Sequence, residues 1–194
     1  IPHLVLVVNK MDLVDWSADR FAEIFGRPAS VAGAPGWTAN GLSVEAYEAH
    51  GIRVSSDTRG GPPFRPRRAG GEPSGLVEVP STLPTLDELL AWEEFRGPLR
   101  EAAVEHLRRE VAASTGIAVH SIHTEIEGGR AFSPLFARQL AAWAADGVSF
   151  VTLSEAAAAA PGPLDARELR FVTVRGRAMP VATGEAGGRG RLAG

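Results

Sequence analysis

The sequence predicts an α/β fold in which short strands alternate with helices around a parallel sheet. The apolar run at 4–8, "LVLVV", is typical of a strand that is buried on both faces. Amphipathic helical patterns follow, most clearly over 98–114 and 134–145. Turn residues such as Gly51 separate the segments, and this alternation of strands with helices favours a parallel sheet.

Length and composition indicate an ordinary globular chain. It has 194 residues, 44% hydrophobic and 22% charged, which is enough apolar material for a core. The net charge of −3 argues against a nucleic-acid partner, and the lack of cysteine excludes disulfides and thiolate ligands. No signal peptide or membrane-spanning run is visible, so we expect a cytoplasmic location. The first residue is Ile rather than Met, and we expect a fragment.

The first half of the chain predicts alternating elements that end in a long loop. Ser17 is suited to cap a helix over 17–25, and Gly51 is suited to end another helix. The loop contains five Gly, four Pro and three Arg, and loops of this length are usually functional or mobile. The expected elements are a helix at 17–25, a strand at 29–34, a helix at 43–51, a strand at 52–56 and the loop at 60–75.

The second half continues the alternation. Its polar cluster "HTEIEGG" stands at the C-terminal end of an expected strand. From Pro161 the chain becomes rich in Gly and Arg, which predicts a partly disordered extension over 161–194. The expected elements are an extended segment at 76–85, a helix at 98–114, a strand at 117–122, a helix at 134–145, a strand at 148–153 and a helix at 154–160.

Asn9, Lys10 and Asp12 follow the first strand in the pattern Asn-Lys-x-Asp. This pattern resembles the guanine-recognition motif of GTPases, and residues 1–25 are similar to the GTPase subunit of sulfate adenylyltransferase. The resemblance implies that Asp12 would accept protons from guanine. No phosphate-binding Gly-x-x-x-x-Gly-Lys-Ser/Thr sequence accompanies it, so we expect a polar turn after a buried strand and no useful GTP binding.

Five sequence blocks carry a second resemblance. They are "GRPASVAGAPGWTAN", "SSDTRGGPPFRP", "VPSTLPTLDE", "IHTEIEGG" and "GVSFVTLSE". In this order they resemble the C-terminal half of NodB-like polysaccharide deacetylases, and within them the ArnD-like formamido-arabinose-phosphoundecaprenol deformylases. The resemblance implies an incomplete (β/α) barrel at 26–160, preceded by a foreign strand-helix segment at 1–25 and followed by the extension at 161–194. It also implies a lipid-linked sugar substrate at the inner face of the bacterial inner membrane.

The resemblance implies metal-assisted hydrolysis of an N-acyl bond. In the intact family a divalent ion (Zn, Mn or Co), held by one Asp and two His, activates water, and a second Asp acts as base. His123 matches the histidine that protonates the leaving amine, and its near-neutral pKa range suits that role. Glu125 and Glu127 would orient His123 or contact substrate, because a strand would place all three on one face.

Four further residues are candidates for substrate binding. Asp57 and Arg59 follow the strand at 52–56, and Arg59 or Arg65 could bind a phosphate. Trp37 could stack on a sugar ring or fill the mouth of the barrel, and Thr38 stands where relatives often carry Arg. The alternative for Asp57 and Arg59 is a turn led by Asp with a solvated Arg.

The family's metal ligands and base are not recognisable. The Asp-Asp pair and the His-x-x-x-His pattern are absent, and a strand would point His120 and His123 to opposite faces. We therefore expect no metal or other cofactor in this chain and no turnover alone. The alternative is a non-enzymatic module that binds sugar or lipid phosphate. An open barrel would expose apolar surface, so we also expect a missing half or another chain to cover it, with the strand at 4–8 docking beside the sheet.

Overall fold

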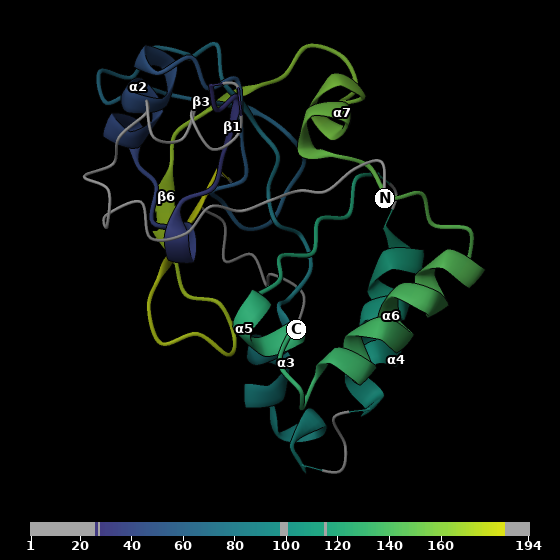
Figure 1. The fold of residues 1–194 in the computed structure, drawn as a ribbon. Helices are drawn as coiled ribbons and strands as arrows, with labels where there is room; N and C mark the ends of the chain where they lie inside the picture. The colour runs from purple at the N-terminus through teal and green to yellow at the C-terminus, as the bar shows by residue number, and fades with distance from the viewer. Residues whose placement is uncertain (1–25, 27, 98–100, 115, 185–194) are drawn as a thin grey trace.

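The parallel sheet lies at the centre of one half of the molecule. The computed structural model describes residues 26, 28–97, 101–114 and 116–184. The sheet has the order β1-β2-β4, and both pairs of neighbours are parallel. Its strands are β1 (Val31–Ala32), β2 (Val54–Ser55) and β4 (Val77–Glu78). The α/β class and the parallel sheet predicted from the sequence are therefore confirmed (Figure 1).

Register explains the two faces of this sheet. Val31, Val54 and Val77 are aligned in one row, and the valine row packs against the last helix, α7 (Leu153–Ala158). The next row, which ends in Glu78, faces the opposite side, toward α2 (Gly41–Ala49). Successive side chains of a strand point to opposite faces of the sheet. The valine row therefore lies on one face, and the row that ends in Glu78 lies on the other.

Residues 166–183 form strands of two smaller sheets, and one of these sheets pairs with the first half of the chain. One is parallel and the other is antiparallel. Their strands are β3 (Arg65–Pro66) with β5 (Ala166–Arg167), and β6 (Arg170–Val172) with β7 (Val181–Thr183). Residues 161–184 of the extension predicted at 161–194 are described and contain β5, β6 and β7, and residues 185–194 lie outside the described part.

The helices other than α2 and α7 form a second layer beside the sheet. Figure 1 shows α4 and α6 side by side, with α3 and α5 near one end of the pair. The remaining helices are α3 (Leu86–Ala91), α4 (Ala102–Ala113), α5 (Thr124–Glu127) and α6 (Ser133–Ala145), with 3-10 turns η2 (Pro35–Trp37) and η3 (Glu93–Phe95). The helices expected near 43–51, 134–145 and 154–160 are confirmed to within a few residues. The helix expected over 98–114 is confirmed from Ala102 onward, and 98–100 lie outside the described residues.

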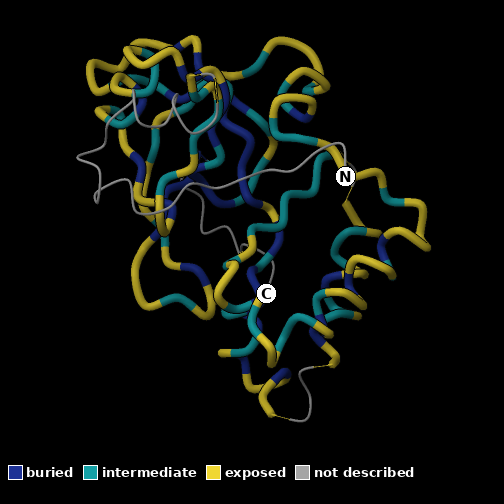
Figure 2. Tube along the Cα trace, in the orientation of Figure 1, coloured by how far each residue is buried: buried dark blue, intermediate teal, exposed yellow. Residues whose placement is uncertain are grey.

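The main apolar core lies between these helices. Leu89 of α3 and Leu107 of α4 are completely buried there, and Leu135 and Trp143 of α6 are nearly so. The valine row of the sheet belongs to a separate core with Ala156 of α7. Figure 2 shows buried backbone both in the sheet region and along the facing sides of α4 and α6. The described residues thus form two packed layers joined by the segment that contains α3.

Two predicted strands are wrong. Residues 117–122 form no strand; the backbone contacts of Val119 are with Thr82 and Leu83. Residues 148–152 also have no strand pairing, and Phe150 and Val151 are each 58% exposed. Both runs have the β-branched composition of strands, but a strand also requires a neighbouring strand, and local composition does not supply one.

The three-stranded sheet does not close into a barrel within the described residues. The candidate nucleotide residues Asn9, Lys10 and Asp12, and the helix expected at 17–25, lie outside the described part of the chain. Among the residues described, no helix is both long enough and apolar enough to span a membrane.

Candidate functional site

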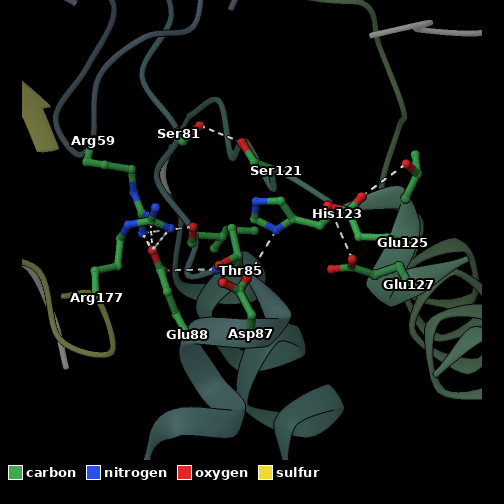
Figure 3. Close-up of polar contacts among 12 residues, drawn as sticks. Arg59, Ser81, Thr85, Asp87, Glu88, Ser121, His123, Glu125, Glu127 and Arg177 are labelled. Carbon is green, nitrogen blue, oxygen red and sulfur yellow. Dashed lines mark hydrogen bonds and ion pairs between the residues drawn. The ribbon is translucent and has the colours of Figure 1, made fainter. Parts of the chain in front are cut away.

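His123 and Asp87 form the accessible part of the candidate site. His123 stands immediately before α5, and its Nδ1 lies 3.2 Å from Oδ1 of Asp87, in the first turn of α3 (Figure 3). The two atoms are within ion-pairing distance when the imidazole is protonated, and their geometry does not form a hydrogen bond. Their side chains are 35% and 38% exposed. The imidazole is therefore held beside a carboxylate while solvent can still reach it.

His123, Glu125 and Glu127 do not lie together on one strand face, because the chain turns helical directly after His123, which corrects the strand-like register predicted for them. Residues Thr124–Glu127 form a helical turn, so Glu127 lies one turn after His123 and accepts its backbone N–H at 2.8 Å. Glu127 is buried, and burial raises the pKa of its carboxyl. Glu125 is exposed and accepts a hydrogen bond from the Thr124 hydroxyl at 3.3 Å. Glu127 therefore fixes the backbone of His123.

Arg59 and Glu88 form a buried ion pair behind Asp87. Arg59 donates from Nη1 to Oε1 of Glu88 at 2.6 Å and from Nη2 to Oε2 at 3.0 Å. The side chains are 6% and 0% exposed, and Nη2 also donates to the carbonyl of Leu83 at 3.2 Å. Arg59 was predicted to contact substrate, but the structure places its guanidinium inside, with both terminal nitrogens bound to protein groups.

Two guanidinium groups pack against Trp37. Those of Arg59 and Arg177 are each 4.7 Å from the centroid of the indole, and Trp37 is 5% exposed. Its Nε1 donates to Oγ of Ser81 at 3.1 Å, and the hydroxyl of Ser81 is 2.7 Å from that of Ser121. Trp37 was predicted to stack on a sugar or to fill the barrel mouth. In this arrangement the guanidiniums cover the indole, and no exposed face is left for a sugar.

Asp57 and Glu78 are buried together on the α2 side of the sheet. Oε1 of Glu78 accepts from the backbone N–H groups of Asp57 at 2.7 Å and Thr58 at 2.8 Å, and from the Thr58 hydroxyl at 2.8 Å. Oε2 accepts from the hydroxyl of Ser55. Asp57 was predicted to line a substrate cleft, but it is 2% exposed, so the structure places it in the interior.

The pKa values of both buried carboxyls are raised. The Asp57 carboxylate accepts from the backbone N–H of Ala34 and from the hydroxyl of Tyr47. Burial raises the pKa of Asp57. Burial, and then the nearby charge of Asp57, raise the pKa of Glu78 to about 7. Two adjacent buried carboxylates favour a bound proton, because a second charge in the interior is costly.

Arg65 lies in β3 and is partly buried. Its Nη1 donates to the backbone carbonyls of Gly75 at 3.1 Å and Ser74 at 3.5 Å. The long loop expected at 60–75 therefore contains a strand, and Arg65 ties this strand to the C-terminal end of the loop. Its role as a phosphate ligand stays a prediction.

Asp87, Glu88, Ser81 and Arg177 were not recognised from the sequence as members of the site. Only Glu88 carries a local signal, since "TLDE" has the Thr-x-x-Glu spacing of a capping box, and Glu88 accepts the backbone N–H of Thr85 at 3.0 Å. Asp87 is the next residue toward the N-terminus and has no sequence pattern of its own. Arg177 reaches the site from 89 residues further along the chain, which no local pattern reveals.

The described residues contain no group of three or more His, Asp or Glu side chains placed to hold a metal ion. His120 packs edge-on against Trp143, with ring centroids 5.6 Å apart, and burial lowers its pKa to about 4. A neutral imidazole packed in this way serves the core. Within the described ranges, the side chains do not assemble the one-Asp, two-His set that the resemblance implies for a divalent ion. No protein-family model matches the chain.

Glu78→Gln should remove much of the pH dependence of stability below neutral pH. The pKa of Glu78 is higher in the folded chain than its ordinary value of 4.5, so the folded state keeps the proton longer. This contribution is fully present below about pH 4.5 and is lost as pH rises through 7. Urea unfolding at several pH values should show a loss on the order of 2–3 kcal/mol over this range in the wild type, and a smaller one in the variant.

Glutamine reproduces the protonated carboxyl, since its oxygen can accept and its amide can donate to Ser55. The exposed Glu72→Gln provides the matched control and should leave the profile unchanged. A wild-type profile that is flat or rises between pH 4.5 and 7 would contradict the assigned protonation of Glu78.

Arg59→Met should destabilise the fold by about 3–5 kcal/mol, because it leaves the buried Glu88 with the longer ion pair to Arg177 in place of the short one to Arg59. The control is Arg138→Met, which removes an exposed pair with Glu101 and should cost no more than about 1 kcal/mol. Urea unfolding followed by tryptophan fluorescence measures both. Equal, small losses would show that the buried pair does not hold this region.

Proposed function

We propose that this chain is the C-terminal portion of a carbohydrate N-deacylase of the NodB-like type, in which His123 protonates the leaving amine. The intact family would act on a lipid-linked amino sugar. The observation that carries the proposal is the contact between His123 and Asp87 at 3.2 Å, with both side chains about one third exposed. The five sequence blocks support it, because they place His123 where the family has its proton donor.

The arrangement suits proton donation in its geometry. Cleavage of an amide requires a proton for the departing nitrogen, because an unprotonated amide anion is a poor leaving group. Asp87 faces Nδ1 of His123, so Nε2 is the nitrogen left for a substrate. A carboxylate in this position orients the ring and stabilises the imidazolium. His123 would thus be the proton donor, and Asp87 a positioning residue.

We expect the chain alone to have no hydrolytic activity. The family's metal chemistry needs one Asp and two His as ligands and a second Asp as base. Neither pattern occurs in the sequence, and the described residues bring no such group together. Those residues do not fit the ion, so we derive no hydrolytic step through it. A missing half or a second chain would have to supply the ligands and the base.

The alternative functions receive less support. A sugar or lipid-phosphate module was expected to use Trp37 and Arg59, but the indole is covered and the guanidinium is bound to Glu88. Nucleotide binding through Asn9–Asp12 rests on residues outside the described part of the chain. The proton-donor proposal uses groups that are accessible, so it is the function that the geometry favours.

A titration with N-acyl amino sugars tests the proposal. The chain, labelled in its histidine rings, is mixed with an N-acetyl or N-formyl amino sugar and followed by two-dimensional NMR. We expect saturable shifts of the His123 ring signals, assigned through His123→Gln, while His50 stays unchanged because it lies at the end of α2. The corresponding free amine should bind more weakly, because it lacks the acyl group.

Hydrolysis is assayed on the same samples after addition of Zn²⁺, Mn²⁺ or Co²⁺. We expect no release of amine. Release at a rate that depends on His123 would contradict the inactivity of the chain alone. A His123 signal that no N-acyl sugar perturbs at millimolar concentration would contradict the proposed function itself.

A further inference from the structure

The loop between β6 and β7 carries the triplet Arg175-Gly176-Arg177, which lies against α3 and η3. Gly176 has φ +86°, and a Cβ there would lie 2.7 Å from the carbonyl oxygen of Glu88 and 3.0 Å from Nε1 of Trp92. Any other residue would push the loop away from the helix. The two arginines are therefore brought to α3 by a turn that only glycine fits.

Arg175 is the outer contact of this triplet. Its Nη2 lies 2.7 and 2.8 Å from the two carboxylate oxygens of Glu94, and its guanidinium is 4.2 Å from the centroid of Trp92. The side chains of Arg175 and Glu94 are 47% and 53% exposed. An exposed pair of this kind contributes little to stability, so Arg175 should have little effect on the buried residues of the site.

Arg177 is the inner contact. Its side chain is 18% exposed, its Nη1 lies 3.4 Å from Oε1 of Glu88, and its guanidinium covers one side of Trp37. Glu88 is already the partner of Arg59, so two guanidiniums converge on one buried carboxylate (Figure 3). Arg177 thus adds a second guanidinium to both Glu88 and Trp37.

Glu88 and Asp87 are consecutive residues in the first turn of α3. Glu88 also accepts the backbone N–H of Thr85, so its carboxylate fixes the start of the helix. Because adjacent residues in a helical turn move together, the position of Glu88 determines where Asp87 meets His123.

A second connection reaches His123 from the other side. Trp37 is bonded to Ser81, and Ser81 to Ser121, which stands two residues before His123. Both partners of the accessible pair are therefore tethered to the stack formed by Arg59, Trp37 and Arg177.

We propose that Arg177 is a positioning residue, which holds Glu88 and Trp37 so that Asp87 faces His123. The inference rests on the proposed function for the meaning of that pair, but its geometry can be tested without any substrate. Residues 166–184 then belong to the site, because the triplet brings Arg177 to Glu88 and Trp37.

The test compares Arg177→Met with Arg175→Met in the full chain. Long-range ¹H–¹⁵N NMR of the histidine rings reports which nitrogen of His123 carries the proton when the ring is neutral. In the wild type we expect the Nδ1–H form, directed at Asp87. Arg177→Met should shift the ring nitrogens of His123 toward a mixture of tautomers, as Asp87→Asn should, while Arg175→Met should leave them unchanged.

Gly176→Ala provides a second route, since its Cβ would displace the loop and should reproduce the Arg177→Met spectrum. Arg177→Lys should restore part of the wild-type signal, because it keeps the charge near Glu88. A folded Arg177→Met chain with an unchanged His123 signature overturns the inference. If Arg177→Met does not fold, Arg177→Lys and Gly176→Ala decide it by the same signature. A changed signature in a chain that binds no N-acyl sugar would support the positioning role and reject the proposed function.

Discussion

The charge of Glu88 has to be neutralised in the interior, and this constraint organises the centre of the molecule. The side chain is 0% exposed, and an isolated buried carboxylate would be strongly unfavourable. Arg59 arrives from the carboxyl end of β2, and Arg177 from the loop between β6 and β7. These two segments therefore converge on the first turn of α3, and both guanidiniums pack against Trp37.

This buried assembly supports an accessible pair without taking part in it. Asp87 is the residue before Glu88, and its side chain is partly exposed. The backbone N–H of His123 donates to Glu127, and Ser121, two residues before His123, is hydrogen-bonded to Ser81. The residues that first suggested substrate contact, Trp37 and Arg59, form the support behind the pair. The distinction matters for any proposed chemistry, because a rigid interior can orient an imidazole whose other nitrogen remains open to solvent.

The sequence allows the α/β class, the parallel sheet and the long helices to be predicted, because their periodic patterns are local. The strands at 117–122 and 148–153 were predicted wrongly, since β-branched composition does not reveal whether a neighbour is there to pair with. Glu125 and Glu127 were misplaced for the related reason that the chain turns helical directly after His123. Asp87 and Arg177 depend on contacts across the fold, and these leave no mark in short stretches of sequence.

A double-mutant cycle on Arg59 and Glu88 tests the central claim most directly. If the two side chains act as one buried unit, replacing both by Met should cost far less stability than the sum of the single replacements, because both fully buried charges are removed and only the partly exposed Arg177 loses its partner. Urea unfolding of the four chains would then give a coupling of at least about 2 kcal/mol. Single losses that simply add would show that Arg59 and Glu88 contribute independently, and the buried charge would no longer explain the arrangement of the site.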